Sequence, residues 1–147
     1  MKTLFDEHAC QEVLDRISSL RKDAHRKWGK MSVGQMVWHC QIPLKVAIKN
    51  KPTTKKGNLL IRLFFKKSLY NDTPWRKNLP TSPFAKAKEE KDFEMEREQL
   101  TTLVREFHQL KDREEWHPHP LFGSLTKEQW GKSAYKHLDH HLTQFGV

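Results

Sequence analysis

The sequence has few cysteines and no long apolar run, and each lack excludes a class of protein. Two cysteines, Cys10 and Cys40, are too few for a disulfide framework, and their spacing matches no zinc finger. No stretch approaches the roughly 20 apolar residues of a transmembrane helix, and the first ten residues lack the basic and apolar regions of a signal peptide. The sequence therefore predicts an intracellular, cytoplasmic protein that makes no use of a membrane.

Glycine and proline are also not in excess, with six and seven copies in 147 residues. This excludes a collagen-like chain, and a composition of 36% hydrophobic and 31% charged residues argues against a wholly disordered one. A chain of this length has the size of one domain with its own packed core. We expect a single domain over residues 1–147.

Acidic residues are absent from a long segment. Between Ala24 and Asn71 there is no Asp or Glu but eleven Lys or Arg, and the whole chain has a net charge of +9. Such a segment can attract nucleic acid, acidic lipid or an anionic small substrate, or it can be a solvated loop of lysines. No helix-turn-helix or finger pattern appears, and no aromatic residues alternate with the basic ones as in a stacking platform. Nucleic acid is therefore kept as a partner that the sequence does not favour.

Strand signals are almost absent, whereas apolar residues recur at helical spacing. The spacing predicts helices over residues 6–21, 32–50, 58–70, 87–111 and 126–145. Two of them begin with a capping box, formed by Ser32 with Gln35 and by Thr126 with Gln129. Long amphipathic helices bury their apolar stripes most economically against one another. The sequence thus predicts an all-α fold, an up-and-down four-helix bundle with a short extra helix.

Histidine is the unusual residue, with nine copies. His137 and His141 are one helical turn apart, but with nine histidines about half a pair at this spacing is expected by chance. Their position on the helical wheel adds information, because they flank Trp130 at the inner edge of the apolar arc. His39 also faces inward on its own helix. Two facing helices can therefore bring the three histidines to one point.

Three neutral imidazoles hold a divalent cation and leave positions open for water or substrate, as in a catalytic site. The alternative is that each histidine only satisfies hydrogen bonds in the core. Burying three imidazoles without a shared ligand, however, costs desolvation three times. We predict that His39, His137 and His141 are metal ligands. Among the metals that imidazole accepts, we expect zinc or nickel, with iron or manganese as alternatives.

Three segments resemble the DinB-like superfamily, and together they span nearly the whole chain: residues 31–40, the loop 119–126 and the ending 137–145. The specific parts are the H-P-x-F-G loop that begins at His119 and the H-x-x-H-H-x-x-Q-F ending that begins at His137. They look most like a small uncharacterised branch of that superfamily. The middle third of the chain is not diagnostic.

The resemblance implies an up-down-down-up four-helix bundle, a homodimer, and a divalent metal held by three histidines that fall on His39, His137 and His141. Characterised members include thiol transferases that use bacillithiol or mycothiol, and related isomerases and hydrolases. The implied function is that of a metal-dependent transferase or hydrolase with a small-molecule substrate, and the positive charge would favour an anionic thiol or an acidic substrate. The alternatives are a basic nucleic-acid-binding module and an inactive bundle that acts through its surface.

Four other residues are candidates for supporting roles around the metal. Trp28 and Gln35 are plausible walls of a pocket. Gln144 lies beside the histidine pair on the wheel, where it could orient a ligand or water, and His140 is expected to face outward or to support a ligand. No catalytic acid or base is assigned.

Two further residues are expected to be structural. His119 precedes a proline in a loop, and we expect it to bond backbone in a turn closed with Gly123. Cys40 follows His39 but points about 100° away on the wheel, which places it in the core as a small apolar residue.

Overall fold

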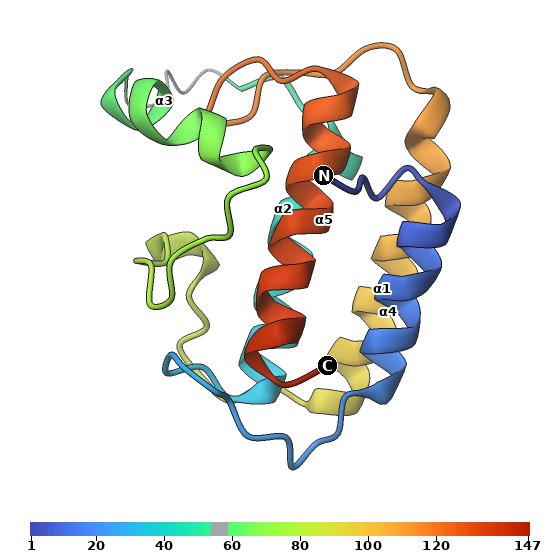
Figure 1. Cartoon of the computed structure of the whole chain (residues 1–147), viewed down its shortest axis with the longest axis vertical. Helices are drawn as coiled ribbons and strands as arrows, with labels where there is room; N and C mark the ends of the chain where they lie inside the picture. Colours follow the sequence, from blue (N-terminus) through green and yellow to red (C-terminus); the bar gives the residue numbers. More distant parts are fainter. Residues whose placement is uncertain (54–58) are drawn as a thin grey trace.

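The computed structural model describes residues 1–53 and 59–147. In this part of the chain the fold is all-helical and contains no strand; an isolated bridge joins His119 and Gly123. The α-helices are α1 (Glu7–Ser19), α2 (Val33–Lys49), α3 (Leu59–Phe65), α4 (Phe93–Gln109) and α5 (Lys127–Gln144). The four long ones, α1, α2, α4 and α5, lie side by side (Figure 1). None of the described helices has the length and apolarity needed to cross a membrane.

Both predicted capping boxes are present and fix the first residues of α2 and α5. The hydroxyl of Ser32 accepts the backbone N–H of Gln35, whose side chain accepts the N–H of Ser32 in return. Thr126 and Gln129 make the same pair of bonds. Each box satisfies two backbone donors that the first helical turn leaves unpaired. The two helices therefore begin within one residue of the predicted positions.

Two predicted boundaries need correction. The acidic helix expected from residue 87 begins only at Phe93, because Asp92 caps it by accepting the backbone N–H of Met95. The helix expected over 58–70 ends early: α3 stops at Phe65 and continues as a 3-10 helix over Lys66–Leu69. Its expected first residue, Asn58, lies outside the described residues.

The core lies between the four long helices, and their apolar stripes meet there. Cys40 is one of its members, 1% exposed and packed against Met36, as the sequence predicted. The largest fully buried apolar side chains come from the N-terminal segment and all four long helices: Leu4, Val13, Ile17, Leu20, Met36, Val37, Leu44, Leu100, Phe107, Leu138 and Leu142. A close-packed core of this kind holds the side chains on its helices in fixed positions.

Arg16 ties α1 to the C-terminal half of α5. Its guanidinium donates to the Asp139 carboxylate (2.7 Å), the Thr143 hydroxyl (3.0 Å) and the backbone carbonyl of Val147 (3.0 Å). The side chain is only 18% exposed, so these bonds are partly shielded from water.

Replacing Arg16 by Met keeps the packing of the side-chain stem but removes these bonds. We expect the free energy of unfolding to fall by about 1–2 kcal/mol. Urea unfolding followed by circular dichroism measures the change. Arg21→Met is the matched control, because Arg21 pairs with Asp23 in full contact with solvent, and there we expect no measurable change. Equal losses in both variants would contradict this role for Arg16.

Candidate metal centre

Three histidines from two helices meet in the interior. His39 lies on α2, and His137 and His141 lie on α5. One ring nitrogen of each lies within 4.8 Å of the others, and the Nε2 atoms of His39 and His137 are 3.0 Å apart. His39 and His141 are buried, whereas His137 is partly open to solvent. The structure thus brings together the three residues that the sequence singled out, and such a cluster could bind a metal ion.

Hydrogen bonds outside the cluster fix the orientation of two of the rings. The Nδ1–H of His39 donates to the backbone carbonyl of Ala85 (2.7 Å), and the Nδ1–H of His141 donates to the side-chain oxygen of Gln144 (2.9 Å). A neutral imidazole that gives its hydrogen at Nδ1 keeps a lone pair at Nε2. Both rings therefore offer Nε2 as the ligand atom, in the arrangement that metal-binding histidines usually have.

Gln144 is itself held in place by the loop before α2. Its amide nitrogen donates to the backbone carbonyl of Trp28 (2.7 Å), and its own backbone carbonyl accepts the N–H of Lys27 (2.8 Å). Gly29 has a φ of +83°, and a Cβ at this position would collide with the Gln144 amide. The loop is thus in close contact with the side chain that orients His141.

His137 completes the set of nitrogens. Because the Nε2 of His39 carries a lone pair, the ring of His137 must donate a hydrogen to it when nothing else lies between them. A cation can take the place of that hydrogen. Two imidazole nitrogens on one tetrahedral zinc, each about 2.0–2.1 Å from it, lie about 3.3 Å apart. The separation of 3.0 Å is close to this value, so the donor set fits a divalent metal ion.

Burial keeps these rings neutral. It lowers the pKa of His39, against the opposing effect of the Ala85 carbonyl, and it lowers the pKa of His141 to about 3. Burial also lowers the pKa of His137, and the neighbouring rings of His141 and His39 lower it further. A neutral imidazole is the form that binds metals. The cluster is therefore ready to bind a cation near pH 7 without first losing protons.

Aromatic side chains form a rim against His137 and His140. The ring centroid of Trp75 lies 5.9 Å from that of His137 and 5.6 Å from that of His140. Trp28 lies 5.6 Å from His140 on the other side, and the ammonium of Lys77 stands 4.8 Å from the centre of the Trp28 ring. His140 is half-buried in this rim, and burial lowers its pKa.

The other residues singled out from the sequence divide between the site and the scaffold. Trp28 lies at the rim, and Gln144 contacts His141. The amide of Gln35 is used elsewhere: it closes the capping box and donates to the backbone carbonyl of Glu89 (3.3 Å). Gln35 is thus a capping residue, and no contact joins it to the histidines.

His119 has the structural role that the sequence predicted. Its Nδ1 accepts the backbone N–H groups of Leu121 (3.0 Å) and Phe122 (3.3 Å), and two backbone bonds of 2.9 Å pair it with Gly123. Burial lowers the pKa of His119 to about 4, which keeps Nδ1 free to accept these bonds. It is not part of the histidine cluster.

Three contributors to the site were missed in the sequence. Ala85 acts through its backbone carbonyl, which no side-chain pattern reveals. Trp75 and Lys77 lie between the helices predicted over residues 58–70 and 87–111, where the sequence predicted no site residue. An isolated tryptophan in a polar, basic loop is a signal that could have identified Trp75, because large aromatic residues in loops often line ligand sites.

A family model described as "Protein of unknown function (DUF1569)" matches residues 2–146. The search among curated proteins and the search among solved structures found no match.

Proposed function

The chain belongs to the DUF1569 family, and we propose that it holds one divalent metal ion on His39, His137 and His141. The observation that carries this proposal is the orientation of the two buried rings. His39 and His141 each donate the Nδ1–H to a fixed carbonyl oxygen, which leaves Nε2 as the ligand atom. Histidines that only satisfied hydrogen bonds would not need to converge. Zinc or nickel is the proposed ion, with iron or manganese as alternatives.

We also propose that the DUF1569 fold is an up-down-down-up bundle like that of the DinB-like superfamily. Support comes from the chain directions in Figure 1, where α1 and α5 run one way and α2 and α4 the other. Further support comes from the ligand set, because two helices supply all three histidines. The match of the family model over residues 2–146 supports the proposal that the chain is one domain. A homodimer stays a prediction of the resemblance.

The proposed activity is that of a metal-dependent transferase or hydrolase on a small molecule, with a low-molecular-weight thiol as the favoured substrate. When bound, a divalent ion supplies Lewis acidity that lowers the pKa of a thiol or water. Three protein ligands would leave room for such a substrate. The chain's own part is to hold three neutral imidazoles, to shield them from water, and to leave His137 partly open as the side of approach.

The test is a screen of untagged, metal-loaded protein with low-molecular-weight thiols and electrophilic acceptors, with His141→Ala as the background. Turnover that the variant loses supports the proposal. A loaded site without turnover of any thiol or ester would contradict an enzymatic role and favour a protein that acts through its surface. Metal-independent binding to DNA that falls steeply with salt would favour the nucleic-acid alternative.

Gln144→Leu tests the orientation of the rings. The substitution removes the acceptor for the Nδ1–H of His141 while it preserves the approximate volume of the side chain. We expect the affinity for zinc to fall by about 10–100-fold, which is the usual effect of losing such a support. Competition with a chelating dye measures it. Gln109→Leu on the exposed end of α4 should leave the affinity unchanged, and an unchanged affinity in Gln144→Leu as well would count against the proposed orientation.

A further inference from the structure

Two loops near the histidine cluster are basic and contain no acidic residue. We call residues 24–31 and 73–88 the basic loops. They contain three and four Lys or Arg, respectively, and no Asp or Glu. The rest of the chain has 20 Lys or Arg against 18 Asp or Glu and is close to neutral. A further acid-free stretch, residues 45–67, holds eight Lys or Arg, so the basic loops are one of two strongly positive parts of the sequence.

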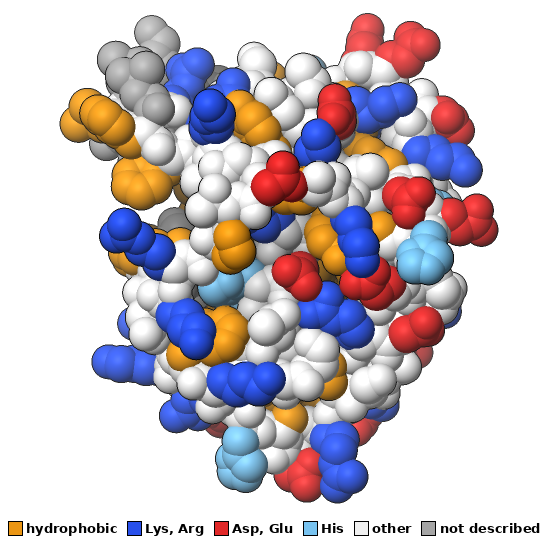
Figure 2. Space-filling view, in the orientation of Figure 1, with side chains coloured by type: hydrophobic (Ala, Val, Ile, Leu, Met, Phe, Trp, Pro, Cys, Tyr) orange, Lys and Arg blue, Asp and Glu red, His pale blue; other side chains and the backbone are white. Residues whose placement is uncertain are grey.

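The second basic loop contacts the cluster directly, and the first reaches it through Gln144. The first supplies the carbonyl of Trp28 that holds Gln144, and the second supplies the carbonyl of Ala85 that holds His39. The second also places Trp75 against His137. In Figure 2, Lys and Arg side chains predominate on the left of this face, whereas most Asp and Glu side chains lie to the right, over α1 and α4. The basic loops thus place positive side chains on the side of the molecule where the cluster lies.

The basic loops also carry apolar surface that the core does not use. Phe84 is 58% exposed and Leu79 is 46% exposed, and the rings of Trp28 and Trp75 are half-buried. Among the described residues, no ion pair includes Lys77 or Lys86, which lie in the same loop. Unpaired cations beside aromatic and apolar side chains form a surface that suits an anion with an apolar part.

We propose that the substrate of this site is a small molecule with an anionic group and an apolar or aromatic part, and that the anionic group lies against Lys77 and Lys86. This inference rests on the proposed function and deepens it. A small ligand is favoured over nucleic acid because the cations and rings lie in two short loops beside one cluster, whereas nucleic acid needs an extended groove with several exposed stacking residues.

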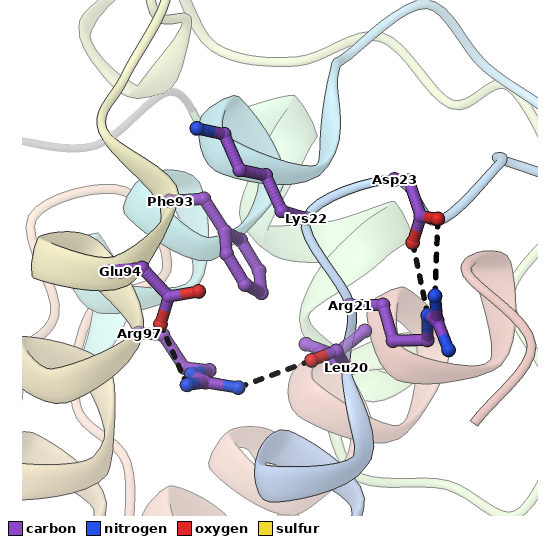
Figure 3. Close-up of a pocket in the computed structure, with 7 residues that line it drawn as sticks. All are labelled: Leu20, Arg21, Lys22, Asp23, Phe93, Glu94 and Arg97. Carbon is purple, nitrogen blue, oxygen red and sulfur yellow. Dashed lines mark hydrogen bonds and ion pairs between the residues drawn. The ribbon is translucent and has the colours of Figure 1, made fainter.

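Another surface cavity, of about 620 Å³, lies between the end of α1 and the start of α4 (Figure 3). Two of its three cations, Arg21 and Arg97, already have partners. Arg21 pairs with Asp23, and Arg97 donates both to Glu94 and to the backbone carbonyl of Leu20. No histidine of the cluster lines it. An anion there would meet one cation without a described ion pair, Lys22, and would have to compete with internal partners for the other two, whereas the second basic loop offers both Lys77 and Lys86.

The test is calorimetric titration of zinc-loaded protein with phenyl phosphate, and with phenyltrimethylammonium as a cation of similar shape. Phenyl phosphate should bind and the cation should not. Lys77→Ala combined with Lys86→Ala should weaken phenyl phosphate binding about tenfold, because two nearby charges are lost. The matched control combines Lys111→Ala with Lys127→Ala, which removes the same charge from exposed positions outside the basic loops and should change the affinity less than about twofold.

The metal content of the same samples separates the two proposals. The proposed function is overturned if the protein takes up no zinc. It is also overturned if the His141→Ala variant takes up as much zinc as the unchanged protein. Zinc-loaded protein that binds the cation as well as the anion, or that loses equal affinity in both double variants, overturns only the inference about the substrate. A short DNA duplex could also displace phenyl phosphate and bind the metal-free protein. That result would assign the basic loops to nucleic acid and would also overturn the inference about the substrate.

Discussion

His141→Ala is expected to lower the affinity of the protein for zinc or nickel by more than about 100-fold, because it removes one of three ligands outright, whereas losing a supporting bond alone costs 10–100-fold. The other two imidazoles cannot replace it, since they would then offer only two nitrogens to the ion. Competition titration against a chelator of known affinity measures the loss. Circular dichroism of the variant shows whether the helices are retained.

His140→Ala is the control, because it changes the adjacent residue of the same helix. His140 is half-buried and contacts the rings of Trp28, Trp75 and His141, but its nitrogens are not among the clustered ligand atoms. We expect its affinity for metal to stay within about threefold of the unchanged protein, since a rim residue acts only through packing. If the two variants lost metal equally, or if neither did, the assignment of ligands would be wrong.

Metal binding is also expected to stabilise the fold strongly. An ion that binds only the folded chain adds about 2.7 kcal/mol when its free concentration is 100 times the dissociation constant. For a chain of this length the midpoint of thermal unfolding should rise by about 9 °C. The reason is that the site joins α2 to α5, so that the bound ion links two elements distant in the sequence. Scanning calorimetry with zinc, and again after a chelator, measures the shift.

The same scan on His141→Ala distinguishes the site from loose binding at the surface. Without the third ligand, zinc at that concentration should move the midpoint by less than about 1 °C. A shift of equal size in the variant would mean that zinc binds elsewhere, for example to exposed histidines. A fall of the midpoint with zinc in the unchanged protein would mean that the ion prefers the unfolded chain.

The helices were largely predictable because their signals are local. The capping boxes at Ser32 and Thr126 place the starts of α2 and α5, since a side chain three residues away completes each box. The start of α4 was misplaced because residues 87–92 have a helix-like composition, and only the cap at Asp92 marks where the helix begins. The end of α3 was missed for a similar reason, since nothing in Lys66–Leu69 distinguishes a 3-10 turn from an α-helix.

The convergence of the histidines was predictable because helical periodicity determines which side chains face the core. The wheel put His39, His137 and His141 on inner faces, and the structure places them together. Periodicity says nothing about loops. The Ala85 carbonyl orients His39 directly, and the Trp28 carbonyl orients His141 through Gln144. Both carbonyls come from segments whose sequence has no regular pattern. Contacts made by backbone atoms of loops depend on the folded chain and leave no trace in residue type.

The most direct test of the three-histidine site is X-ray absorption at the metal edge of the untagged protein after loading with zinc. We expect one ion per chain and a first shell that contains three imidazole nitrogens at about 2.0–2.1 Å, completed by oxygen ligands from solvent. A shell with one imidazole or with sulfur ligands, or protein that retains no ion, would contradict the site.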